Sequence, residues 1–132
     1  MNRLRPTPVA ACALLLALPF VLLSCQRHTV QRYTGRGRVA QLPGPQGSRL
    51  LYLQHEAIAG YRDRLGNVVG MSAMTMPFPL APDASLAGIA VGDAVAFDLR
   101  VDWQAETEVE ITQVRKLPAG TRLVFTEAPP AR

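Results

Sequence analysis

Cysteine is nearly absent from the sequence, and this scarcity removes several classes of site. The 132-residue chain has two cysteines, Cys12 and Cys25, and none after residue 25. The body of the chain therefore offers no thiol pair for a disulfide, a thiolate zinc site or a redox motif. Histidine is equally scarce, with only His28 and His55. A soft-metal site in the body of the chain must use thioether and imidazole donors.

The chain also has no hydrophobic run long enough to span a membrane. Its longest apolar stretch, Val9–Leu23, is shorter than the roughly 18–20 residues that a spanning helix needs, and Pro19 interrupts it. A short basic region with Arg3 and Arg5 precedes this stretch. A basic region followed by a short apolar segment is typical of secretory signals, so we expect residues 1–24 to be a signal peptide.

The end of this signal resembles the lipobox of bacterial lipoproteins. Apolar and small residues, Leu22-Leu23-Ser24, precede Cys25, which predicts cleavage after residue 24 and a lipid on Cys25. The alternative is ordinary signal cleavage that leaves Cys25 as a free thiol. Residues 25–32 are predicted to be a tether. Gln26 is not the aspartate associated with retention in the inner membrane, so we expect a periplasm-facing anchor in the outer membrane.

Charge of one sign does not dominate the chain. Loss of Arg3 and Arg5 with the signal leaves 12 basic against 10 acidic residues, a net charge of +2, in 108 residues. That length suits one small domain. The basic residues are dispersed and are not interleaved with aromatic residues, which disfavours a nucleic-acid partner. No nucleophile–base set, carboxylate dyad or phosphate loop is present, so we expect no enzyme activity.

Short alternating segments separated by turn residues predict an all-β fold. The five expected strands are Tyr33–Leu42, Arg49–Ile58, Met74–Phe78, Ala94–Val101 and Thr107–Leu117. A short helix is expected at Ala84–Ala90, between the third and fourth strands, with Asp83 or Ser85 as its cap. This order indicates a small five-stranded OB-like barrel over residues 33–117. Residues 118–132 are predicted to be a C-terminal tail.

Glycine and proline add local detail to this barrel. Gly35 and Gly37 permit a bend or bulge in the first strand. The apolar phase shifts between Ile111 and Val114, which predicts a bulge in the last strand. The prolines on either side of Phe78 cannot donate to a sheet ladder, so the third strand should lie at an edge.

Methionine is concentrated in one short stretch. Met71, Met74 and Met76 are the only methionines after the initiator, and His55 continues the inward-facing row of the second strand. Met74 and Met76 alternate, so their side chains share a face. Thioether and imidazole donors favour Cu(I) or Ag(I). Without a metal, the histidine would be a satisfied core residue and the methionines barrel filling. Glu56 is expected to be a solvated strand residue, and the alternative is that it supports the metal ligands from behind.

These residues also match a known pattern. The sequence resembles the CusF-like family of periplasmic copper- and silver-binding proteins in four motifs. They are YTGRGRV from Tyr33, HE-x-I-x-G from His55, MTMPF from Met74 and L-x-x-I-x-V-GD from Leu86. The resemblance implies a five-stranded OB-type barrel with His55, Met74 and Met76 as metal ligands. Family members carry a metal-capping tryptophan where this chain has Met71, which either supplies a further sulfur or packs beside the site; we favour coordination.

The resemblance implies a monomeric metallochaperone rather than an enzyme. We expect an envelope lipoprotein that binds Cu(I) or Ag(I) as cargo and passes it to a metal-efflux or copper-delivery partner. The membrane would be contacted through the lipid anchor, and no nucleic acid is expected as a partner. Two alternatives stay open, namely an OB-type module that binds a non-metal ligand and a structural envelope lipoprotein.

Overall fold

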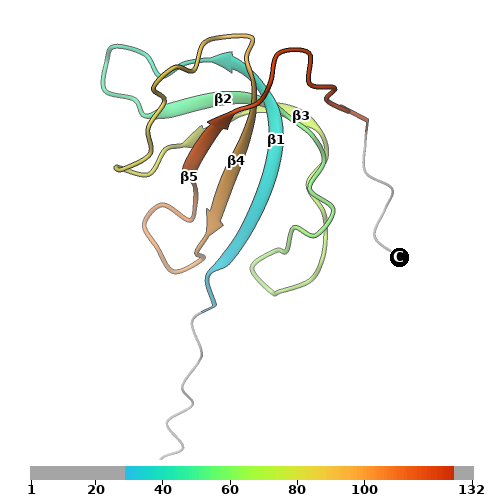
Figure 1. The fold of residues 1–132 in the computed structure, drawn as a ribbon. Coiled ribbons are helices and arrows are strands. Elements are labelled where there is room, and N and C mark those ends of the chain that lie inside the picture. The colour runs from blue at the N-terminus through green and yellow to red at the C-terminus, as the bar shows by residue number, and fades with distance from the viewer. Residues whose placement is uncertain (1–28, 127–132) are drawn as a thin grey trace, which may run out of the picture.

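Five strands form one sheet in the computed structural model, which describes residues 29–126 (Figure 1). The strands are β1 (Gln31–Gln41), β2 (Leu50–His55), β3 (Met74–Pro79), β4 (Ala94–Val101) and β5 (Val109–Lys116). No helix long and apolar enough to cross a membrane occurs between residues 29 and 126. The predicted signal peptide and Cys25 lie outside the described residues.

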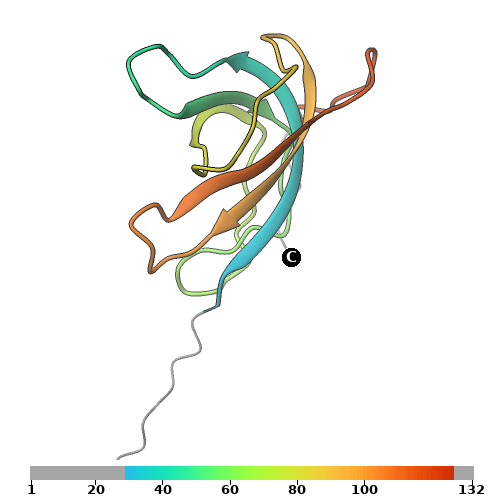
Figure 2. The same cartoon turned by 60° about the vertical axis from the view of Figure 1, so that its left-hand side comes forward.

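The sheet has the order β3-β2-β1-β4-β5, and each neighbouring pair is antiparallel. Beyond β3, a parallel bridge from Leu80 to Ile111 brings the two outer strands together. The strands curve strongly around a common interior, as two views show (Figures 1 and 2). The predicted five-stranded all-β fold is therefore confirmed, with β3 at an edge of the hydrogen-bonded order as its prolines required.

The core follows from the alternation in the sequence. In β2 and β4 every second side chain is buried, and the intervening residues are partly exposed. The fully buried large side chains come from all five strands: Phe78, Phe97, Leu51, Leu53, Leu99, Ile111, His55, Val39, Val95 and Val101. One imidazole thus lies within an otherwise apolar interior.

The two glycines of β1 allow close approach of neighbouring elements. A β-carbon on Gly35 would lie 2.5 Å from the Phe97 ring, and one on Gly37 would lie 2.7 Å from the backbone oxygen of Gln54. The bulge in β1 falls elsewhere, where the register with β2 skips a residue between Val39 and Gln41. These glycines therefore let the sheet curve over the core rather than form the bulge.

The bulge expected in β5 is confirmed. Asp98 of β4 pairs with Gln113, whereas the next residue, Leu99, pairs with Ile111, so Thr112 is the extra residue. The start of β1 differs from the prediction by two residues. Gln31 already pairs with Val101 at the end of β4, so part of the segment expected to be tether is strand.

The helix predicted at Ala84–Ala90 is wrong. The amide of Ile89 donates to the carbonyl of Leu86, 3.0 Å away, which closes a single four-residue turn. Gly88 has φ of 75°, in the left-handed region that ends a helix. The Ser85 hydroxyl accepts a hydrogen bond from the amide two residues later, 3.2 Å away. Local cap and turn bonds therefore replace the expected helical ladder.

Candidate metal centre

The β2–β3 pairing places the predicted donors opposite one another. His55 pairs directly with Met74, and Leu53 pairs with Met76. Directly opposite residues of an antiparallel pair project to the same face with β-carbons about 4.5–5.5 Å apart. The interior row of β2 therefore ends at His55 beside the first methionine of β3. The alternation predicted from the sequence accounts for this arrangement.

His55 is fully buried, with 0% of its surface exposed. Its Nδ1 lies 2.7 Å from the carbonyl oxygen of Glu56. A carbonyl can only accept, so Nδ1 carries the proton and Nε2 carries a lone pair in the neutral ring. Nε2 is buried and has no hydrogen-bond partner. The ring also packs edge-on against Phe78, with centroids 5.5 Å apart.

The orphaned Nε2 is what a metal-binding imidazole requires. A buried polar atom without a partner is destabilising by roughly 1–3 kcal/mol, and a bound metal would remove that penalty. The alternative of a satisfied core histidine holds for Nδ1 of His55 but not for Nε2. The residues present therefore fit a soft monovalent ion. In residues 29–126, no group of three or more His, Cys, Asp or Glu side chains could hold a metal.

The two methionines of β3 differ in exposure. Met74 is 51% exposed, whereas Met76 is partly buried and packs against the core. Both lie on an edge strand with Pro77, which lacks an amide donor. The two thioether side chains thus extend from the interior to the surface, so a metal-ligating sulfur could be reached from solvent at Met74.

Met71 belongs to an extension of the same ladder. It forms an isolated bridge with Ile58 through two backbone hydrogen bonds of 2.9 and 3.0 Å. Its side chain is partly buried and packs against the core. The connecting segment Ala59–Gly70 is held by further bonds, including a second bridge between Arg62 and Val68. Met71 is consequently placed by an ordered hairpin, three residues before Met74.

Trp103 lies in the β4–β5 connection and packs against the Ala59–Gly70 segment. Its ring contacts Tyr61 edge-on at 6.5 Å, and the guanidinium of Arg64 lies 5.3 Å from its centroid. Tyr61 also packs on Tyr33 at 5.4 Å. Burial, with a smaller contribution from Tyr33, raises the pKa of Tyr61 above its ordinary value. This cluster packs the hairpin that leads to Met71 against the start of β1 and the β4–β5 connection.

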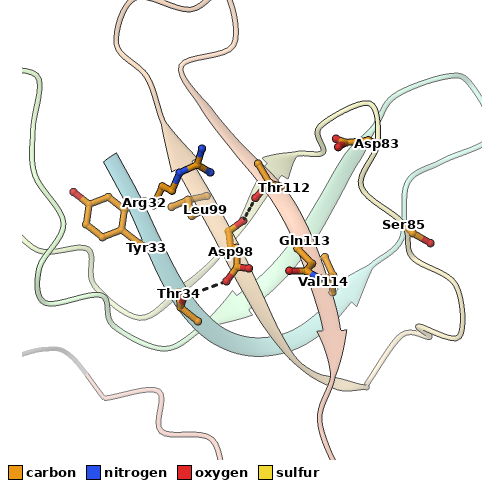
Figure 3. Close-up of a pocket in the computed structure, with 10 residues that line it drawn as sticks. All are labelled: Arg32, Tyr33, Thr34, Asp83, Ser85, Asp98, Leu99, Thr112, Gln113 and Val114. Atoms are coloured by element: carbon orange, nitrogen blue, oxygen red, sulfur yellow. Dashed lines mark hydrogen bonds between the residues drawn. The ribbon is translucent and has the colours of Figure 1, made fainter. Parts of the chain in front are cut away.

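A hollow of about 630 Å³ lies elsewhere on the molecule (Figure 3). Its lining is mostly polar, and Asp98 within it accepts from the Thr34 hydroxyl at 3.1 Å. The Arg115 guanidinium, bonded to both oxygens of Asp98, holds the pKa of that carboxyl below its ordinary value. The lining contains one aromatic residue, Tyr33, and no methionine or histidine. It does not form the repeated stacking surface of OB modules that bind nucleic acids.

The side chains of His55, Met74 and Met76 form a donor row along the β2–β3 ladder. Together with the fold, this row defines a small β-barrel protein with thioether and imidazole groups at one sheet edge. The chain belongs to the family described as copper binding periplasmic protein CusF, whose family model matches residues 32–116. No curated protein sequence matches the chain significantly.

Solved structures of CusF are similar in fold. Apo-CusF from Escherichia coli is 19% identical, with 72% of this chain and 98% of that chain covered and a TM-score of 0.50. The silver-bound form from Escherichia coli is 21% identical, with 67% and 94% covered and a TM-score of 0.43. A Cu(II)-bound variant from the same organism, with a tryptophan replaced by alanine, is 23% identical, with 67% and 94% covered and a TM-score of 0.46. At 19% identity, the likeness to apo-CusF shows the fold alone.

Proposed function

We propose that this protein is a periplasm-facing metallochaperone that binds Cu(I) or Ag(I) through His55, Met74 and Met76. The observation that carries the proposal is the buried, unpartnered Nε2 of His55 directly opposite Met74 on the neighbouring strand. Membership of a family described as copper binding and periplasmic supports the same cargo. Structures of CusF with silver and with copper add to this support.

Met71 is proposed as a further thioether ligand. It precedes Met74 by three residues on the hairpin that the Ile58 bridge holds in place. A flexible, unbranched side chain with a polarizable sulfur suits this position at the border between core and surface. Packing against the core is the competing role, and labelled methionine methyl groups distinguish the two roles, as described in the Discussion.

The donor row suits transfer as well as binding. Met74 is half exposed at an edge strand, whereas His55 is buried. A partner could therefore displace the thioether of Met74 first and release His55 last, so that the metal is never free in solution. Thioethers carry no proton to exchange, so each step needs only ligand substitution. An efflux or copper-delivery protein of the envelope is the partner that this chemistry fits.

A transfer experiment tests the carrier function. The chain from residue 26, which contains every residue that the structure describes, is loaded with one Cu(I) and mixed with a thioether-rich acceptor peptide. We expect transfer whose rate rises with acceptor concentration, because the acceptor attacks the protein-bound metal. A rate independent of acceptor concentration would mean release into solution first and would contradict a carrier. An absence of metal binding would favour the structural or non-metal readings.

We also propose that the chain is lipid-anchored at Cys25, in the outer membrane. The proposal rests on the lipobox pattern and on the lack of another role for this cysteine. Mass spectrometry of the amino-terminal peptide from membrane-extracted protein should find a diacylglyceryl Cys25, and Cys25→Ala should abolish the modification. An unmodified peptide that begins after residue 24 in the wild type would overturn the proposal.

A further inference from the structure

The residue that follows His55 connects the candidate metal centre to the segment that follows the last strand. Glu56 has a side chain only 15% exposed. Its carboxylate accepts two hydrogen bonds from the Arg36 guanidinium, at 2.8 and 3.0 Å. The amide of Val124 donates to the same carboxylate at 2.7 Å, across 68 residues of sequence. Glu56 is therefore bonded to β1 and to the C-terminal segment (residues 117–126) at once.

The C-terminal segment lies outside the family match, which ends at residue 116. It begins with a bond from the Leu117 amide to Ala94 and a turn at Pro118–Thr121. From residue 121 to 126, partly buried and exposed positions alternate, so one side of the segment faces the protein. Figure 1 shows it passing beside the β2–β3 end of the barrel, where Val124 bonds Glu56. The C-terminal segment therefore contacts the barrel through Val124 and through its partly buried side.

The backbone of Glu56 orients the imidazole ring of His55. Its amide donates to the Arg36 carbonyl at 2.9 Å, and its own carbonyl accepts from Nδ1 of His55 at 2.7 Å. The carboxylate contacts and the backbone contacts therefore fix Glu56 through its side chain and through the peptide units on both sides of its α-carbon. The Glu56 carbonyl determines which ring nitrogen carries the proton, and hence which one is free for metal.

We propose that Glu56 is a positioning residue for His55 and that the Val124 amide of the C-terminal segment completes its support. The proposal rests on His55 being a metal ligand, as argued above. Without the Val124 bond, Glu56 loses a charge-assisted hydrogen bond and its carbonyl is held less firmly against Nδ1, so the Nε2-protonated ring becomes accessible. That tautomer cannot bind metal through Nε2. Loss of such supporting contacts lowers metal affinity by about 10–100-fold.

Proline at residue 124 gives a sharp test, because it lacks the amide proton. Val124→Pro deletes the donor to Glu56 at a position that is half exposed, and Val124→Ala is the matched control that keeps the amide. Glu56→Gln provides a second variant of nearly the same shape, without the charge that pairs with Arg36. Thermal unfolding of all four proteins identifies any general loss of folding.

Two measurements are made on the chain from residue 26. Nitrogen NMR of the metal-free neutral imidazole reports the His55 tautomer, and competition with a Cu(I) chelator reports affinity. We expect Val124→Pro and Glu56→Gln to show mixed tautomers and an affinity about 10–100-fold lower than wild type, with Val124→Ala unchanged. A pure Nδ1-protonated ring and unchanged affinity in Val124→Pro would overturn the proposal.

The two readouts separate this proposal from the proposed function. If the wild type binds no Cu(I), the metal function fails, while the tautomers of the variants still decide whether Glu56 positions the ring. If the wild type binds Cu(I) and the variants lose affinity with an unchanged tautomer, the metal function stands and the positioning role of Glu56 is overturned.

Discussion

The double variant Met74→Leu/Met76→Leu is expected to bind Cu(I) with an affinity more than roughly 100-fold lower than wild type. Loss of a residue that only supports a metal ligand costs at most about 100-fold. Met74 and Met76 pair with His55 and Leu53 and so share one face of the β2–β3 ladder, and both sulfurs are lost in this variant. Leucine conserves volume, so the partly buried Met76 should be replaced with a stability change below about 1.5 kcal/mol. Competition with a Cu(I) chelator measures the affinity.

The two single variants show how much each thioether contributes to Cu(I) affinity. Met76→Leu should cost more affinity than Met74→Leu, because the more buried sulfur is harder for water to replace. Denaturant unfolding of each metal-free protein provides the control for folding. If the double variant folds and retains wild-type affinity, neither thioether is a ligand and the methionines serve only as packing.

Gly37→Ala is expected to reduce both stability and metal binding. The new β-carbon would lie 2.7 Å from the Gln54 carbonyl oxygen and 3.0 Å from the α-carbon of His55. These are backbone atoms, so β1 and β2 must separate at the rung where Gly37 pairs with His55. Overpacking of this kind lowers the free energy of unfolding by about 1–3 kcal/mol, and the displaced imidazole should bind Cu(I) more weakly.

Two other glycines provide controls for Gly37→Ala. Gly60→Ala adds a β-carbon with no atom within 4 Å, and it should leave stability and binding unchanged. Gly35→Ala would press on the Phe97 ring instead of on β2, so it should lower stability with a smaller effect on metal affinity. Equal losses of affinity in Gly35→Ala and Gly37→Ala at equal stability would show that the effect is general loosening rather than displacement of His55.

The strands and the donor row were predictable because both depend on local alternation. Leu51, Leu53 and His55 occupy every second position of β2, and the prolines beside Phe78 correctly indicated an edge strand. The helix at Ala84–Ala90 failed because its alanines suggested helix, whereas Gly88 adopts a left-handed conformation that closes a turn. In short segments, one such residue outweighs helix propensity.

The partners of Glu56 could not be predicted from the sequence, although a supporting role for this residue was one of two alternatives. Alternation placed Glu56 on the outer face of the predicted second strand, where a solvated side chain is the ordinary expectation. Its partners Arg36 and Val124 lie 20 residues before it and 68 residues after it, and no local pattern relates them. The unsatisfied Nε2 of His55 was equally hidden, because hydrogen-bond partners within a core depend on three-dimensional packing.

The measurement that we would make first follows the methionine methyl groups by NMR during Ag(I) titration of the chain from residue 26. Selective carbon labelling reports the three methionines after the initiator separately, and Ag(I) avoids the oxidation that complicates Cu(I). We expect the Met74 and Met76 methyl signals and the His55 Nε2 resonance to shift and to saturate at one equivalent of Ag(I). The Met71 methyl signal should shift with them if its sulfur coordinates. Unchanged Met74, Met76 and His55 signals in the folded protein at excess Ag(I) would contradict the proposed metal centre.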